Sequence, residues 1–152
     1  MLGSPAKEDK CRKCQGDGSS CKTVTGLLDM NNLQVGYNDI LLIPQGATNI
    51  LIQERSPSNN YIAIRNLTGH YYLNGNYRID FPRPMTFAGS LWTYERKPNG
   101  FAAPDKITCL GPVAEAVYLV VCFINELKHA KSPQHTSSIL SLSFYHKIKM
   151  LA

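Results

Sequence analysis

The sequence predicts an all-β protein, built as an antiparallel sandwich or barrel. Short runs rich in β-branched and aromatic residues recur up to Phe123, at roughly ten-residue spacing. Turn-forming residues separate these runs, and the 11 glycines and 9 prolines are spread along the whole chain. No segment up to Phe123 has a clear apolar period of the kind that an amphipathic helix needs.

Three strands are expected in the first half of the chain. The run at 36–44 is followed by a turn that begins at its last residue, a proline. The run at 48–54 alternates between apolar and polar residues, so Ile50 and Ile52 are expected on one face. The run at 60–66 alternates in the same way, which predicts a third strand.

The strongest local signal is the pair Asn74-Gly75, which lies between two β-rich runs in the segment 70–81. An Asn-Gly pair readily adopts the type I′ turn, whose twist matches that of two adjoining strands. The sequence therefore predicts a tight β-hairpin centred on these two residues.

Further strands are expected after this hairpin. The segment 85–96 predicts two strand pieces with a bend at Ala88-Gly89-Ser90, and the runs at 106–112 and 116–124 follow. The segment 125–152 is polar and basic, then weakly apolar. Its part at 139–144 alternates and is compatible with a strand, but a terminal stretch of this composition is more often poorly ordered.

Length and charge limit the function. A chain of 152 residues predicts one domain with short extensions. The net charge of +5 favours anionic partners, namely sulfated glycans, nucleic acid or an acidic protein surface, although a solvated basic surface is an equal alternative. The chain has no run of about 20 apolar residues and no signal-peptide pattern, so we expect any export signal to lie upstream.

Five cysteines cannot all pair with one another. Cys11 and Cys14 have the spacing of half a zinc site, but all four histidines lie far away in the sequence. A redox pair is also disfavoured, because a turn-rich stretch follows where a helix is needed. A disulfide fits this glycine-, serine- and aspartate-rich segment better. Cys109 and Cys122 lie in apolar runs and are expected to be buried free thiols rather than a mutual disulfide.

No catalytic constellation is present in the sequence. It has no metalloprotease helix motif, no nucleophile elbow and no phosphate-binding loop, and its carboxylates are scattered singly. We therefore expect no enzyme activity, no metal and no cofactor. Asn66-Leu67-Thr68 is a sequon for N-glycosylation, which is a weak signal by itself.

Aromatic residues cluster in the predicted strands of the central region. A sugar-stacking face is one interpretation, and packing in the core or in cross-strand pairs is the more common one. The aromatic residues concerned are Tyr71, Tyr72, Tyr77, Trp92 and Tyr94.

The motifs, taken in order, resemble the ADAMTS and ADAMTS-like secreted proteins, at the end of their cysteine-rich module and in their spacer module. The resemblance runs from about Glu8 to about Ile124. It rests on the ordered motifs at 9–26, 36–54, 60–66, 69–82, 87–96 and 110–112.

The resemblance implies a fold and a function. The spacer of such proteins is a jelly-roll β-sandwich without catalytic activity. It binds extracellular matrix and sulfated glycans, or a protein substrate as an exosite. The parent protein is then secreted, with no nucleic-acid partner and no membrane span. Two alternatives are a piece of a secreted zinc metalloendopeptidase whose catalytic domain lies elsewhere, and a lectin-like sandwich that uses the aromatic residues, Trp92 above all.

The resemblance also implies a division of the chain and roles for its residues. Residues 1–21 correspond to the end of the cysteine-rich module, 22–127 to the spacer and 128–152 to a divergent tail, expected to be poorly ordered. Cys11 pairs with Cys21 in the family pattern, and Cys14 pairs with an upstream cysteine that is missing from this chain, so Cys14 is expected to be unpaired. The candidates for contact with an anionic ligand are Arg12, Lys13, Lys22, Arg78, Arg83, Arg96 and Lys97.

Two departures from the family pattern stand out. Arg12 occupies the position of a glycine between the first two cysteines, which adds a charge. After residue 125 the chain lacks the expected turn and final strand, so a recognition loop and one strand of a sheet are in doubt. The sequence does not show whether 139–144 replaces that strand.

Overall fold

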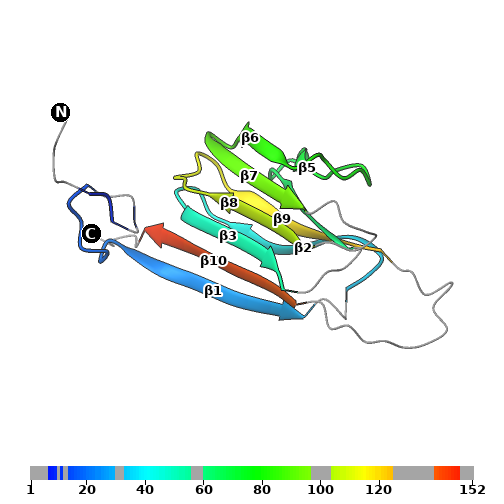
Figure 1. The fold of residues 1–152 in the computed structure, drawn as a ribbon, viewed down its shortest axis with the longest axis horizontal. Coiled ribbons are helices and arrows are strands. Elements are labelled where there is room, and N and C mark those ends of the chain that lie inside the picture. The colour runs from blue at the N-terminus through cyan, green and yellow to red at the C-terminus, as the bar shows by residue number, and fades with distance from the viewer. Residues whose placement is uncertain are drawn as a thin grey trace.

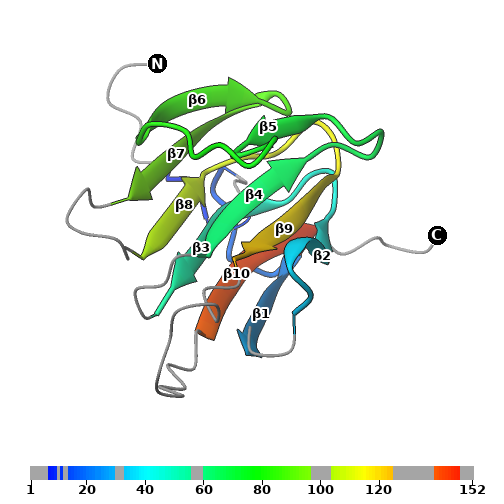
Figure 2. The same ribbon diagram turned by 90° about the vertical axis from the view of Figure 1, so that its right-hand side faces the viewer.

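The structure is a computed structural model. It describes residues 7–9, 11, 14–29, 33–55, 60–96, 104–124 and 139–147. These residues form ten strands in two antiparallel sheets, with no helix in the described ranges. Figures 1 and 2 show the two sheets as layers that face each other. The expected fold class, an all-β antiparallel sandwich, is confirmed.

One layer is a six-stranded sheet with the strand order β1-β10-β3-β8-β7-β6. Its strands, in that order, are Cys21–Asp29, Ile139–Lys147, Thr48–Glu54, Asp105–Cys109, Ser90–Arg96 and Arg83–Phe87. Strands β1 and β6 are therefore the two edges of this sheet, and they lie on opposite sides of the layer in Figure 1.

The other layer is a four-stranded sheet with the order β2-β9-β4-β5. Its strands are Gly36–Ile43, Val117–Phe123, Tyr61–Arg65 and Tyr71–Leu73. Strand β9 lies between β2 and β4, and five residues of the apolar run 117–123 are buried.

The core fills the space between the two sheets. Strand β3 shows the expected alternation, because Ile50 and Ile52 are buried while Leu51 and Gln53 are more exposed. Strand β4 is buried on both faces from Tyr61 to Ile64. Apolar burial of this kind is the main favourable term in folding, at about 25 cal/mol per Å² removed from water.

The predicted hairpin at Asn74-Gly75 is wrong. Strand β5 pairs with β4 in one sheet, and β6 pairs with β7 in the other, so residues 74–82 cross between the layers. A type I′ turn needs a positive φ at both central residues. Asn74 has φ +55°, but φ of Gly75 is not positive. The next residues with a positive φ are Asn76 and Tyr77. The buried side chain of Asn74 instead shapes a wider loop.

The two-residue hairpin lies further along, between β6 and β7. Phe87 pairs with Ser90, and the intervening Ala88 and Gly89 have φ +49° and +69°, as a type I′ turn requires. A Cβ atom on Gly89 would lie 2.5 Å from Cβ of Ala114, so this position has no room for a side chain. The bend expected at Ala88-Gly89-Ser90 is thus confirmed.

The structure corrects the expected tail. Residues 139–147 form strand β10, which pairs with β1 along nine residues and with β3 on its other side. Leu140 and Phe144 are buried in the core, which explains why this alternating segment is ordered. The rest of the tail, 128–138 and 148–152, lies outside the described residues, and the proposed domain boundaries stay a prediction.

Candidate functional site

The end of the molecule before β1 is closed by a disulfide. Cys11 and Cys21 are joined, with their Cα atoms 5.6 Å apart, which is the pairing that the family resemblance implies. The carboxylate of Asp9 accepts hydrogen bonds from the backbone N–H groups of Cys11 and Gly18. Cys14 is an exposed free thiol, and its pairing with an upstream cysteine stays a prediction.

The other two cysteines are buried. Cys109 on β8 and Cys122 on β9 are free thiols, as expected from their apolar runs. Burial raises the pKa of both thiols, because the protein interior disfavours the thiolate. Both are therefore neutral packing groups rather than nucleophiles.

The described residues offer neither a metal-binding cluster nor a membrane-spanning helix. In the described ranges, no group of three or more histidine, cysteine, aspartate or glutamate side chains is arranged to hold a metal ion. Over the same part of the chain, no helix is long and apolar enough to span a membrane.

Arg96 has a structural partner. Its Nη1 lies 2.7 Å from Oδ1 of Asp105, and the side chains of the two residues are 13% and 0% exposed. Asp105 also accepts hydrogen bonds from the hydroxyl of Tyr94, at 3.0 Å, and from the backbone N–H of Ile62, at 2.9 Å. Ile62 belongs to the other sheet, so this carboxylate joins the two layers. We call Tyr94, Arg96 and Asp105 the buried arginine cluster.

Opposing effects act on the carboxyl of Asp105. Burial raises its pKa above the usual value, while the hydrogen bond from Ile62 N–H and the charge of Arg96 act to lower it. Burial has the larger effect, so the folded protein holds this carboxylate at a cost that its donors offset in part. The guanidinium of Arg96 is engaged here and is not free for an outside ligand.

A second arginine is also engaged. Arg65 on β4 makes two hydrogen bonds to the carboxylate of Asp39 on β2, at 3.1 and 2.6 Å. Its guanidinium carbon lies 4.2 Å from the centre of the Tyr118 ring on β9, in a cation–π contact. The outer face of the four-stranded sheet is therefore neutral at this point.

Two of the candidate arginines are free. Arg78 lies in the segment Asn74–Pro82, which we call the β5–β6 loop, and Arg83 begins β6. Both residues are exposed, and neither guanidinium has an ion-pair or hydrogen-bond partner among the described residues. The one acidic residue of the loop, Asp80, accepts a hydrogen bond from Asn74 N–H at 2.7 Å. Two guanidiniums against one carboxylate leave this region positively charged.

Internal hydrogen bonds hold the β5–β6 loop. Oδ1 of Asn74 accepts from Asp80 N–H, at 2.6 Å, so these two residues bond in both directions. Nδ2 of Asn74 donates to the carbonyl of Ile62, at 2.8 Å, inside the molecule. The hydroxyl of Tyr37 donates to Asn74 O and accepts from Tyr77 N–H, which ties the loop to β2. The loop therefore has one defined shape.

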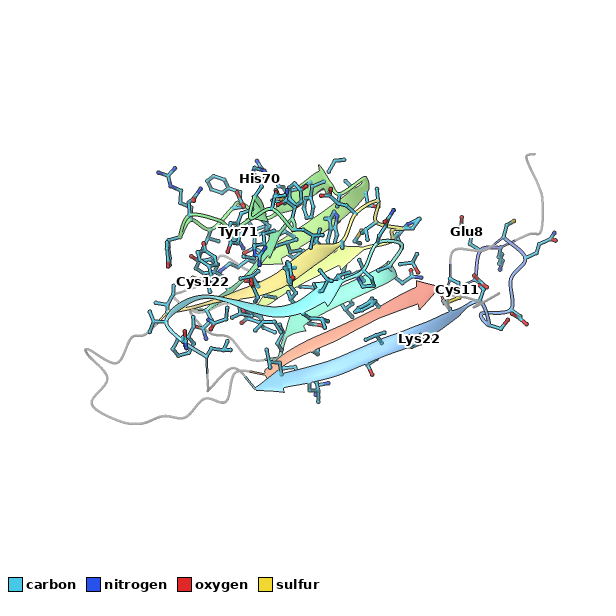
Figure 3. All side chains as sticks on the ribbon, turned by 180° about the vertical axis from the view of Figure 1, so that it is seen from behind. Glu8, Cys11, Lys22, His70, Tyr71 and Cys122 are labelled. Atoms are coloured by element: carbon cyan, nitrogen blue, oxygen red, sulfur yellow. A yellow bond between two sulfur atoms is a disulfide. The ribbon has the colours of Figure 1, made fainter. Side chains whose placement is uncertain are left out.

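Lys22 lies apart from Arg78 and Arg83. It is exposed on β1, at the opposite edge of the six-stranded sheet from Arg83. Figure 3 shows Lys22 near Cys11, far from the sheet region that carries His70 and Tyr71. Arg12, Lys13 and Lys97 lie outside the described residues, so their place in a ligand contact stays a prediction.

Of the five candidate aromatic residues, two pack in the core, as the more common interpretation predicted. Trp92 and Tyr94 are 1% and 2% exposed, so they belong to the core, and the Trp92 ring stacks on Phe87. Tyr71 and Tyr72 are half-buried. Tyr77 alone of the five is largely exposed, at 68%. The lectin-like alternative therefore loses the residue on which it mainly rested.

The sequon lies in the turn between β4 and β5. Oδ1 of Asn66 accepts hydrogen bonds from the N–H groups of Thr68 and His70 and from the hydroxyl of Thr68, at 2.8 to 3.0 Å. Residues 67–70 are exposed. The turn is therefore open to solvent on its outer side.

Sequence reasoning missed part of the β5–β6 loop. Ile79 and Phe81 are 46% and 82% exposed, although their alternation with polar residues predicts that one side faces a core. The signal that could have found them is the pair of prolines that follows Phe81, because proline removes backbone donors and limits strand pairing.

The fold and this site define a class of protein: a two-sheet β-sandwich with a disulfide-closed end and a positively charged, internally bonded loop between its sheets. Residues 23–144 match the family model described as ADAM-TS Spacer 1, and the chain belongs to this family. The matched region includes the first part of β10, which places that strand within the family's module.

Curated relatives agree with the family assignment. The chain is similar to papilin from Drosophila melanogaster, at 64% identity over 121 residues, and to human papilin, at 43% over 118. It is also similar to human A disintegrin and metalloproteinase with thrombospondin motifs 6, at 37% over 121 residues. These matches cover 80%, 78% and 80% of this chain but only 4%, 9% and 11% of the relatives.

Proposed function

We propose that this chain is a non-catalytic extracellular binding module, which recognises sulfated glycans of the matrix through the β5–β6 loop and the start of β6. The observation that carries this proposal is the pair of exposed arginines, Arg78 and Arg83, without partners among the described residues. Arginine suits sulfate well, because its planar guanidinium presents two parallel donors to an oxyanion.

The charge of the whole chain supports an anionic partner. The net charge of +5 attracts polyanions over a distance set by ionic strength, about 8–10 Å under physiological conditions. Lys22 lies at the other edge of the sheet and contributes to this general field rather than to the same contact. Arg96 takes no part, because Asp105 holds it.

An extracellular location is part of the proposal. A disulfide such as Cys11–Cys21 persists in oxidising compartments and is rare in the cytosol. The matrix as the site of action follows from the family resemblance. N-glycosylation at Asn66 is proposed from the sequon, its exposed turn and the disulfide, and a loss of mass on glycosidase treatment that Thr68→Ala abolishes would test it.

A protein substrate is the second proposed ligand, in an exosite role. Its support is the presence of metalloproteinases among the relatives, with 37% identity for the human protein named above. Papilins reach higher identity than this metalloproteinase, 43% to 64%, which favours a papilin-like parent over a zinc metalloendopeptidase.

Heparin chromatography tests the glycan proposal. The full chain, made in an oxidising compartment, is expected to bind heparin weakly and to elute at moderate salt, since salt screens exposed charges. The double variant Arg78→Ala/Arg83→Ala is expected to elute at clearly lower salt. Lys22→Ala is the matched control and should elute close to the parent chain. Binding that ignores salt, or an unchanged double variant, would contradict the proposal.

A further inference from the structure

The β5–β6 loop exposes large apolar side chains as well as arginines. Tyr77, Ile79 and Phe81 are 68%, 46% and 82% exposed, and they lie within five residues of one another. Among the described residues, the other exposed large apolar side chains lie singly along the chain, so this concentration in one short segment is unusual. The glycan proposal makes no use of these three side chains.

Hydrogen bonds and a ring contact hold the loop that carries these three side chains in one conformation. Asn74 and Asp80 bond to each other twice, and Tyr37 fixes both Asn74 and Tyr77. The Tyr37 ring also contacts the Tyr77 ring, with centroids 4.9 Å apart. A surface that is already ordered loses little conformational entropy when a partner binds.

The residue types are those of a protein interface. Tyrosine, phenylalanine and arginine are enriched where proteins bind one another, and a few such residues carry most of the binding energy. A sulfated glycan would contact Arg78 and Arg83 but would gain little from Ile79 and Phe81, because its surface is polar and strongly hydrated. The apolar side chains therefore favour a protein as the occupant.

The charge of the loop selects the kind of protein. Arg78 lies between Tyr77 and Ile79, Arg83 follows Phe81 by two residues, and Asp80 is engaged with Asn74. Positive rims of this kind favour partners with complementary negative charge. A second copy of this chain is disfavoured, because two molecules of net charge +5 repel each other.

We propose that Tyr77, Ile79 and Phe81, together with Arg78 and Arg83, form a preformed docking surface for an acidic protein segment that carries apolar side chains. This proposal rests on the proposed binding function and specifies the chemistry of the protein ligand named there as the second candidate. The apolar residues supply affinity by burial, and the arginines orient the acidic segment.

Synthetic peptides of one length provide the test. The first contains glutamate and leucine with interspersed glycine, the second replaces leucine by serine, and the third replaces glutamate by lysine. Each is titrated into the isotope-labelled full chain while backbone amide resonances are recorded. The glutamate–leucine peptide should shift the amides of residues 75–83 and bind about tenfold more tightly than either of the others.

Variants assign the effect to the loop. Ile79→Ser/Phe81→Ser should weaken binding of the glutamate–leucine peptide by about tenfold. The control is Leu110→Ser, which changes an exposed apolar residue outside the loop, 61% exposed, and should leave peptide binding unchanged. Unfolding midpoints of both variants close to that of the parent chain exclude misfolding as the cause.

The results separate this inference from glycan binding. Equal binding of the glutamate–leucine and glutamate–serine peptides, or amide shifts outside the loop, would overturn the docking surface. Ile79→Ser/Phe81→Ser should still elute from heparin like the parent chain, because both arginines remain. A parent chain that binds the glutamate–leucine peptide but not heparin would contradict only the glycan proposal.

Discussion

The buried arginine cluster and the β5–β6 loop contain the same kinds of residue in opposite environments. Each region combines arginine, tyrosine and aspartate, and they lie on neighbouring strands, since Arg83 pairs with Tyr94 across β6 and β7. In the cluster, the carboxylate of Asp105 is fully buried and holds Arg96. In the loop, Asp80 binds Asn74, so Arg78 and Arg83 face solvent.

This difference shows that the position of the aspartate decides what the arginine does. An aspartate opposite an arginine in the strand register, as Asp105 is to Arg96, turns the cation into a structural group. An aspartate that satisfies a backbone N–H of its own loop leaves neighbouring cations free. Composition alone does not distinguish the two cases.

The largest expected effect comes from breaking the buried cluster. Asp105→Ala removes the acceptor of Tyr94, Arg96 and Ile62 N–H at once and leaves buried donors without a partner. Removing one member of a buried ion pair costs about 3–5 kcal/mol of the free energy of unfolding. Urea unfolding followed by tryptophan fluorescence measures this, because Trp92 is in the core. A loss below about 1 kcal/mol would mean that the cluster does not join the sheets.

A smaller effect is expected from loosening the loop. Asn74→Ala removes the hydrogen bonds to Ile62 O and from Asp80 N–H. It also puts alanine, for which a positive φ is unfavourable, at a position with φ +55°. We expect a loss of about 1–3 kcal/mol in thermal or urea unfolding.

A second substitution at the same position separates the two causes. Asn74→Gly tolerates the backbone conformation but lacks the same hydrogen bonds, so it should recover about 1 kcal/mol. Equal stability of the two variants would show that backbone strain plays no part at this position.

The smallest effect on stability is expected from the free arginines. Arg78→Ala and Arg83→Ala remove exposed side chains without partners among the described residues, so unfolding should change by no more than about 0.5 kcal/mol. Arg96→Ala is the contrasting variant and should cost several times more, because it leaves Asp105 buried without its cation. A large loss for Arg83→Ala would contradict the distinction between structural and free arginines.

The sequence was informative where local pattern decides the structure. The alternation around Ile50 and Ile52 predicted β3, and Ala88-Gly89 predicted the turn between β6 and β7. It failed at Asn74-Gly75, because hydrogen bonds from Asn74 to Ile62 and Asp80 override the local preference for a tight hairpin.

The candidate site was predictable only in part. The sequence identified Arg78 and Arg83, but it grouped them with Arg96, whose ion pair depends on the register of β7 and β8. The role of 139–147 was equally open. This strand pairs with β1 and with β3, which lies more than eighty residues earlier in the sequence, and no local pattern indicates such distant partners. Long-range pairing is the information that a single sequence lacks here.

The most direct test of this account maps a heparin oligosaccharide onto the full chain by backbone amide resonances. We expect the amide shifts to concentrate at residues 75–83 and to become smaller as salt is added. Amides around Lys22 on β1 and Arg96 on β7 should change little. Shifts centred on β1, or spread evenly over all basic positions, would contradict the claim that the β5–β6 loop is the anion-binding surface.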